Sequence, residues 1–540
     1  MEASKDFWNT ENLYIEGDNL DVLKVLRENY LGKIKMIYID PPYNTGNEFV
    51  YNDDFADSYE GFLESCKVYD ENGNLQFDPK ANGESNGRFH TDWLNMIYPR
   101  LKVARDVLAD EGVIFISIDE HEVDNLKKVC GEIFGSQNFV GMVIWERAFA
   151  PKNDTKYFSD SHDYIAVYAK SISNFIIGKL PRTEEANSRY TNPDNDPRGP
   201  WTADNLTVKT YSATYDYPIR TPGGRVVNPA HGSCWRVSKE RFAEMVADNR
   251  VYFGEDGNNV PRQKRFLSEI QDGMTPTTIW KFKDVGHNQE GRQELKKLFD
   301  GKGYFDGPKP TRLLDRILLI ANLQKSDYVL DFFSGSATTA HAVMKLNAED
   351  GGKRKFIMVQ LPEVTDEKSE ARKAGYKNIC QIGEERIRRA GEKVKEEAGD
   401  KAKNLDIGFR VLKLDSSNME DVFYTPEDFN ETHLFSTIDN VKPDRTPLDL
   451  LFQVLPELGI ELSAKIEERE VNGKKVFCVD GTYLIATFDK DVNESTVKEI
   501  AKLQPQYFVM RDASASNDNV LDNFEQIFKH YSPDTIRKIL

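Results

Sequence analysis

The stretch Asp40-Pro41-Pro42-Tyr43-Asn44-Thr45-Gly46 places a carboxylate, a backbone carbonyl and an aromatic ring within four residues. It follows Lys35-Met36-Ile37-Tyr38-Ile39, a short apolar run that predicts a buried strand. The two prolines end that strand, and because Pro42 has no N–H, the Pro41 carbonyl is left free to face a ligand. The turn therefore presents two oxygen acceptors and a tyrosine ring at a strand tip.

This set of groups suits a planar base that carries an exocyclic NH2 group. Two acceptors can take both hydrogens of the amine while the ring of the base stacks on Tyr43. The competing interpretation is a tight turn in which Asp40 only caps a helix. A bare Asp-Pro-Pro would favour that turn, whereas the full seven residues at a strand end favour the base site.

The same seven residues resemble a motif of the amino-group DNA methyltransferases, and in this form they look like the adenine-directed members. Cytosine-directed members more often carry Ser in place of Asp40. The resemblance implies a catalytic site in which Asp40 and the Pro41 carbonyl hold the N6 amine, Pro42 stiffens the turn and Tyr43 stacks on a flipped adenine.

A second candidate site is a turn of small residues between the apolar strand at 328–331 and a predicted helix. Such a turn alone is weak evidence, since its glycine also serves close packing of strand and helix. In the resembling family it is the S-adenosylmethionine loop, where Ala337 replaces a common Gly. The predicted cofactor residues of this turn are Asp331, Phe332, Phe333, Ser334, Gly335, Ser336, Ala337 and Thr338.

Five further positions complete the predicted cofactor site. Lys309 and Pro310 resemble the segment that precedes the loop in this family, and Asp18 follows the first predicted strand. The family usually ends the strand after the loop with an acid that binds the ribose. This chain has Gln360 there and Glu363 three residues later, so the ribose partner stays open between them.

Alternating strands and helices predict a mostly parallel sheet. The catalytic turn comes first and the cofactor loop last, which is the permuted order of the β class of amino-methyltransferases. We therefore expect an α/β fold with a circularly permuted, Rossmann-like methyltransferase domain and a mixed, mostly parallel sheet. This domain is predicted to be discontinuous, comprising residues 1–170 and 305–404.

Residues 171–304 lose that regularity and are predicted to form an inserted target-recognition domain. Basic side chains can neutralise phosphates and aromatic rings can stack on bases. An ordinary solvated surface is the simpler interpretation for any one of them. The candidate DNA contacts are Asn44, Arg198, Trp201, Arg225, Arg236, Arg262, Lys264 and Arg265.

Residues 405–540 predict a small C-terminal α/β domain for dimerisation or partner binding. Over nearly the whole length, segments such as DEGVIFISIDEHE, VLDFFSGSATTAHAV and TPLDLLFQVLPELGIEL are similar to the modification (Mod) subunits of type III restriction-modification systems. This resemblance implies double-stranded DNA as a partner, a Mod homodimer and a restriction (Res) helicase-nuclease subunit.

The chain of 540 residues is longer than one ordinary domain, and its 39% hydrophobic residues are enough to form hydrophobic cores. A net charge of −18 argues weakly against DNA binding, although 147–330 holds more basic than acidic side chains. Scattered cysteines and histidines support no metal site.

Without a long apolar run or signal peptide, we expect a cytoplasmic, DNA-associated bacterial protein and no membrane contact.

The sequence is also compatible with three alternative functions. The enzyme could methylate cytosine N4, or it could be a solitary methyltransferase without a nuclease partner. From another class, the chain could be a catalytically silent DNA-binding or assembly subunit that keeps the fold.

Overall fold

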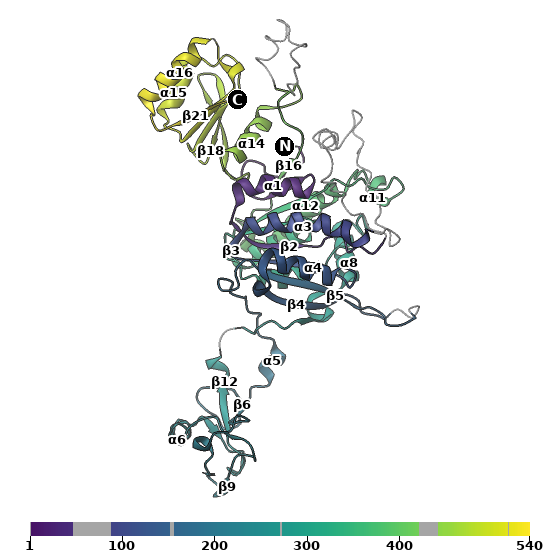
Figure 1. The fold of residues 1–540 in the computed structure, drawn as a ribbon, viewed down its shortest axis with the longest axis vertical. Coiled ribbons are helices and arrows are strands. Elements are labelled where there is room, and N and C mark those ends of the chain that lie inside the picture. The colour runs from purple at the N-terminus through teal and green to yellow at the C-terminus, as the bar shows by residue number, and fades with distance from the viewer. Residues whose placement is uncertain (1, 47–87, 152–155, 271–272, 421–440, 517) are drawn as a thin grey trace. The chain divides into compact units, whose positions relative to one another are not determined.

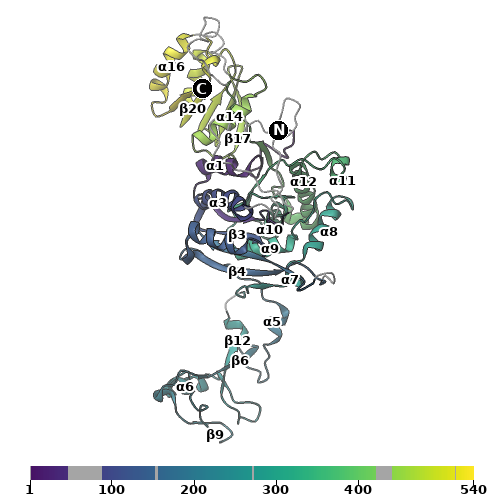
Figure 2. The ribbon, with the colours of Figure 1, turned by 45° about the vertical axis from the view of Figure 1, so that its right-hand side comes forward.

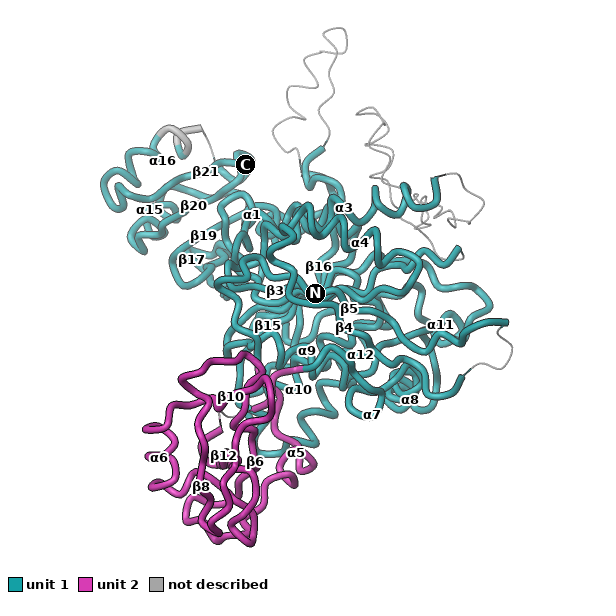
Figure 3. Tube along the Cα trace, turned by 60° about the horizontal axis from the view of Figure 1, so that its bottom comes forward, with its two compact units in different colours: residues 1–178, 277–540 teal, residues 179–276 magenta. Residues whose placement is uncertain are grey.

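The computed structural model describes residues 2–46, 88–151, 156–270, 273–420, 441–516 and 518–540. The chain divides into two compact units, residues 1–178 with 277–540 and residues 179–276 (Figure 3). The candidate site lies in the first unit.

A nine-stranded sheet forms the centre of the first unit (Figure 1). All neighbouring strands are parallel except β5, which runs antiparallel to β3 and β4. This confirms the predicted α/β fold with a mixed, mostly parallel sheet. In spatial order the strands are β13 (Ile279–Trp280), β4 (Phe139–Glu146), β5 (His162–Ala169), β3 (Leu108–Ile118), β2 (Ile34–Ile39), β14 (Tyr328–Asp331), β15 (Lys355–Gln360), β1 (Leu13–Glu16) and β16 (Arg410–Lys413).

Helices cover the sheet because its central strands are apolar on both faces. All six residues of β2 are buried. Ile37 and Ile39 join a core cluster with α1 and α3, while Met36 and Tyr38 alternate to the opposite face. Before the C-terminal segment, the helices in the described residues of this unit are α1 (Asn19–Tyr30), α3 (Phe89–Val107), α4 (Val123–Cys130), α7 (Phe282–Val285), α8 (Asn288–Leu298), α9 (Thr311–Ile320), α10 (Thr338–Asp350), α11 (Glu370–Lys373) and α12 (Ile379–Ala398).

The C-terminal segment contains a second sheet, in the order β17-β18-β19-β20-β21. Helix α16 lies beside this sheet (Figure 2), and the ring of Phe508 on β20 lies 5.2 Å from that of Phe528 on α16. The elements are α14 (Pro447–Glu457), β17 (Ile466–Val471), β18 (Lys474–Val479), β19 (Leu484–Thr487), α15 (Glu494–Lys502), β20 (Tyr507–Met510), α16 (Asp518–Tyr531) and β21 (Ile536–Ile539).

Two features tie this segment to the large sheet. The strand at 410–413 was expected with residues 405–540, but it pairs in parallel with β1 as an edge strand of the large sheet. Its Arg410 side chain is fully buried and donates to the carbonyls of Leu462 and Ala464, both at 2.8 Å. The buried arginine therefore links the edge of the large sheet to the segment that follows α14.

The second unit is built from short strands and short helices around a small core that includes Leu206, Trp235 and Phe242. Its two ends meet, since Leu180 and Met274 exchange backbone hydrogen bonds of 2.9 and 2.7 Å. Its elements are α5 (Glu184–Ser188), β6 (Trp201–Asn205), β7 (Thr207–Val208), β8 (Ile219–Arg220), β9 (Val226–Val227), β10 (Cys234–Trp235), α6 (Lys239–Ala247), β11 (Val251–Tyr252) and β12 (Arg262–Phe266).

Among the residues that the structure describes, no helix has both the length and the apolar character needed to cross a bilayer.

Candidate active site

The candidate site lies where neighbouring parallel strands end. Strand β14 pairs with β2, with Leu330 opposite Ile37, and also pairs with β15. Because parallel strands end at the same edge of a sheet, Asp40 after β2 and Asp331 at the end of β14 lie on one edge. The structure thus brings together the two stretches that the sequence places far apart.

Both carboxylate oxygens of Asp40 have a partner. The Tyr43 hydroxyl donates to Oδ1 at 2.9 Å, and Lys309 Nζ lies 2.5 Å from Oδ2. The same ammonium lies 5.2 Å from the centre of the Tyr43 ring and 5.9 Å from that of Trp145. Lys309, predicted as a cofactor contact, is therefore an ion-pair partner of the candidate catalytic acid.

The turn after Asp40 is held from outside the motif. Trp93 on α3 donates its indole N–H to the Pro42 carbonyl at 2.7 Å. Asn44 adopts a left-handed backbone with φ of 61°, which asparagine tolerates well. Its buried amide donates to Glu122 Oε1 at 2.6 Å, which gives Asn44 a structural role, and its predicted DNA contact stays a prediction.

A buried acid on β5 lies near this ion pair. Asp163 is 3% exposed and pairs with Arg147 at 2.6 Å. Burial raises the pKa of Asp163 to about 7, Arg147 and Lys309 oppose the rise, and Asp40 adds to it. Sequence reasoning missed Trp93, Trp145 and Asp163, because their contacts with this site depend on how distant elements pair.

The loop after β14 is ordered by hydrogen bonds. Asp331 accepts from the Thr339 hydroxyl at 2.5 Å and from the Phe333 N–H at 3.2 Å, and burial raises its pKa to about 7. The Gly335 N–H donates to Gln360 Oε1 at 2.7 Å. Ala337 has φ of 61°, the left-handed conformation that explains why glycine suits this position in the family.

The other predicted loop residues differ in burial and contacts. Phe332 is a fully buried core residue, and Phe333 packs against it with ring centres 5.4 Å apart. Ser334 is 6% exposed, and its hydroxyl has no hydrogen-bond partner in the described part of the chain. The loop thus combines an apolar anchor with an unused polar group.

Arg386 on α12 was also missed, because its burial depends on contacts with the distant loop after β14. The side chain is fully buried and donates to the hydroxyls of Ser336 at 2.9 Å and Thr338 at 2.6 Å. A signal did exist: Arg386 lies three residues after the buried Gly383 and four before the buried Ala390, on the apolar stripe of the helix. Burial lowers the pKa of Arg386 to about 10.

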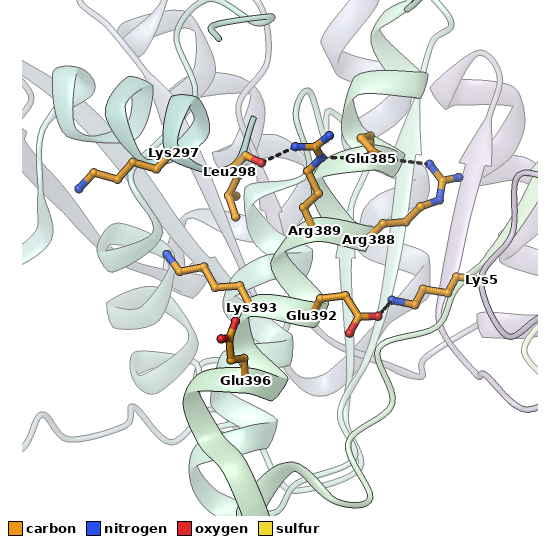
Figure 4. A pocket seen from close by; sticks show the side chains of 9 residues that line it. All are labelled: Lys5, Lys297, Leu298, Glu385, Arg388, Arg389, Glu392, Lys393 and Glu396. Atoms are coloured by element: carbon orange, nitrogen blue, oxygen red, sulfur yellow. Dashed lines mark hydrogen bonds and ion pairs between the residues drawn. The ribbon is translucent and has the colours of Figure 1, made fainter. Parts of the chain in front are cut away.

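The opposite face of α12 is exposed and charged. With α8 it borders an open pocket of about 530 Å³, where Arg389 pairs with Glu385 at 2.7 Å and Lys5 pairs with Glu392 at 2.5 Å (Figure 4). This pocket is separate from the loop after β14. Helix α12 therefore carries Arg386 in a buried contact with that loop and Arg389 at the border of the pocket.

The remaining cofactor candidates are placed as follows. Asp18 caps α1 by accepting from the Leu20 N–H at 2.8 Å and pairs with the buried Arg100 at 3.0 Å. Pro310 precedes α9 directly. Gln360 Nε2 lies 3.5 Å from Glu363 Oε1, so the two ribose candidates are neighbours.

The DNA-contact candidates in the second unit divide by exposure. Trp201 and Lys264 are 4% and 1% exposed, and Lys264 pairs with Asp194 and Asp196. Burial and pairing make these two the least accessible of the predicted contacts, and their DNA contact stays a prediction. Arg198 is partly buried, with its guanidinium paired to Asp196. The exposed candidates are Arg225, Arg236, Arg262 and Arg265.

Comparison with known proteins gives consistent matches. A family model described as DNA methylase matches residues 34–365, which include both halves of the site. The chain is 41% identical to the type III restriction-modification enzyme StyLTI Mod subunit of Salmonella typhimurium over 406 residues, which cover 74% of this chain and 60% of that protein.

Two further Mod subunits of type III enzymes are similar. Identity is 35% to the EcoPI Mod subunit of Escherichia phage P1, covering 75% of this chain and 65% of that protein. It is 32% to the EcoP15I Mod subunit of Escherichia coli, covering 88% and 76%. The chain thus spans less than two thirds of the length of the first two relatives.

Proposed function

Because this chain belongs to the N6/N4 DNA methylase family, we propose that it is an S-adenosylmethionine-dependent DNA methyltransferase that acts on the N6 amine of adenine. The observation that carries the proposal is the position of Asp40 and Tyr43 at the tip of β2, beside the loop that begins at Asp331 on the neighbouring strand. A methyl acceptor and a methyl donor have to meet at such an edge.

The loop residues fit the methyl donor. The unpartnered, buried Ser334 hydroxyl and the backbone N–H groups at the start of α10 suit its carboxylate, and Asp331 suits its amine. We assign the ribose to Glu363, because Gln360 Oε1 already accepts from Gly335. When bound, S-adenosylmethionine supplies a methyl group activated by a positively charged sulfur.

The residues of the catalytic turn act on the target base. Rotating adenine out of the duplex costs a few kcal/mol, and stacking on Tyr43 offsets about 1–3 kcal/mol of that. Asp40 and the Pro41 carbonyl accept the hydrogens of the amine and so direct its lone pair. When the nitrogen takes the methyl group, the donor's sulfur would keep the electron pair of its bond to carbon, and the amine would give up one proton to water. Alignment of the target amine with the methyl donor supplies most of the rate acceleration, since the reaction needs no covalent enzyme intermediate.

At the level of the system, we propose a Mod subunit that acts as a homodimer on double-stranded DNA beside a Res subunit. The support is the similarity to three Mod subunits of type III enzymes. A solitary methyltransferase is the alternative, and the neighbouring gene distinguishes the two. Light scattering tests the dimer, whose mass should be twice that of the 61.8 kDa chain.

The direct test is sequencing that detects modified bases in DNA from cells expressing the chain. We expect N6-methyladenine at one recurring sequence, which would also reveal the recognition site. N4-methylcytosine would reassign the target base to cytosine, whose enzymes more often carry Ser at the position of Asp40. Unmodified DNA, together with no S-adenosylmethionine binding by the purified protein, would identify a silent subunit.

A further inference from the structure

The ammonium of Lys309 lies where two parts of a target base would lie. Its Nζ is 2.5 Å from Asp40 Oδ2, the acceptor assigned to the amine hydrogens. It is also 5.2 Å from the centre of the Tyr43 ring, over the face assigned to base stacking. The Lys309 ammonium thus occupies the position proposed for the exocyclic amine of the target base.

The surroundings of this ammonium keep it in place. Lys309 is 9% exposed and its charge also faces the Trp145 ring at 5.9 Å. Breaking this ion pair would leave the Asp40 carboxylate uncompensated, so we expect Lys309 to leave Asp40 only when another donor takes its place at the carboxylate. The exocyclic amine of a base is such a donor.

The backbone around Lys309 is fixed, which limits how the exchange can happen. Prolines 308 and 310 flank it, and the Thr338 hydroxyl donates to the Lys309 carbonyl at 3.4 Å. Gly291 on α8 packs closely enough that a Cβ there would lie 2.2 Å from the Pro308 carbonyl oxygen. The side chain therefore has to rotate on a stationary backbone, and lysine has the flexible stem for this.

We propose that Lys309 is a positioning residue that occupies the target-amine position of the ligand-free protein and must release Asp40 before the base enters. This inference rests on the proposed function of the site. It predicts that base entry is a competition between the Lys309 ammonium and the target amine for one carboxylate oxygen.

The test uses the full-length protein and a duplex that carries the recognition sequence found by modified-base sequencing. A 2-aminopurine placed beside the target adenine reports when that adenine leaves the stack. K309M removes the ammonium at similar volume, and K309R keeps the charge with more donors for Asp40. K302M changes an exposed lysine of the same segment and serves as the matched control.

Without methyl donor, we expect the unstacked population to rise about tenfold in K309M over the wild type. K309R should stay at or below the wild type, and K302M should equal it. Equal fluorescence of K309M and wild type at saturating protein would overturn the inference, as would a rise in K309R. Binding of S-adenosylmethionine by each variant checks folding, and wild-type protein that neither methylates DNA nor binds this donor would instead reject the proposed function.

Discussion

At the scale of single residues, the geometry of Asp40 is set mainly by neighbours outside its own strand. The Tyr43 hydroxyl and the Lys309 ammonium hold one oxygen each, and Trp93 holds the turn through the Pro42 carbonyl. The carboxylate is therefore oriented before any ligand arrives. Preorganised groups of this kind contribute to catalysis because, once the Lys309 ammonium has left, the carboxylate needs no rearrangement during the reaction.

Asp40→Ala should abolish methylation while DNA binding stays close to that of the wild type. The loss of an aligned acceptor is expected to lower kcat by about 10²-fold or more. Methyl transfer from labelled S-adenosylmethionine and a DNA-binding titration measure the two effects. Asp110→Ala, which changes an acid whose side chain is 77% exposed, is the control. Near-normal turnover of the Asp40 variant would refute the role given to this carboxylate.

At the scale of elements, helix α12 separates two roles of charged side chains. Its buried face supports the loop at 334–338 through Arg386, while the partly buried Arg389 pairs with Glu385 and Asp300. Nε and Nη2 of Arg386 have no partner among the described residues. A buried cation that is incompletely paired is poor at stabilising a fold. Its placement is therefore better explained by ordering of the loop than by stability.

Arg386→Met should weaken binding of S-adenosylmethionine by about tenfold, because the Ser336 and Thr338 hydroxyls lose a donor worth about 1–3 kcal/mol. The melting temperature should stay level or rise, since a buried charge is removed. Calorimetric titration and thermal unfolding measure the two quantities, with Arg389→Met as the matched control. A parallel loss of stability and affinity would show that Arg386 supports the whole fold instead.

A buried carboxyl pair between β1 and α12 should make stability depend on pH. Burial and the neighbouring Glu16 raise the pKa of Glu384 to about 8 from an ordinary 4.5. Because the folded pKa lies above the unfolded one, the stabilising contribution is complete below about pH 4.5 and is lost as pH rises through about 8.

Glu384→Gln, which stays neutral, should remove this loss. The wild type should therefore melt lower relative to this variant at about pH 9 than at about pH 5, by about 1 °C for each kcal/mol of lost stability in a chain of this length. Thermal scans across pH measure the difference, and the exposed Glu396→Gln is the control. Parallel melting curves for wild type and Glu384→Gln would exclude the pair as a source of pH dependence.

At the scale of the whole molecule, the second unit has a core of its own and closely spaced ends. Leu180 and Met274 are hydrogen-bonded to each other, so a short linker can join the chain where the unit begins and ends. Its exposed arginines remain the proposed phosphate contacts. Recognition and chemistry would then be separable parts of one chain.

Replacing residues 181–273 with a short Gly-Ser linker should leave binding of S-adenosylmethionine and cooperative unfolding in place. Sequence-specific DNA binding and site-specific methylation should be lost, because the exposed arginines are removed. Calorimetry measures S-adenosylmethionine binding and unfolding. A DNA-binding titration with the mapped sequence measures the loss of specific binding. Retained specificity in the shortened protein would move target recognition to the first unit.

The sequence by itself determined the chemistry at the tips of β2 and β14 and the alternation that builds the sheet. These features are local: prolines end a strand, small residues make a turn, and apolar spacing follows the period of each element. Only the tertiary structure decided that Lys309 pairs with Asp40, that Arg386 lies under the loop and that Lys264 is buried. A charged side chain becomes buried when a partner distant in sequence compensates it, and that pairing depends on how strands and helices assemble.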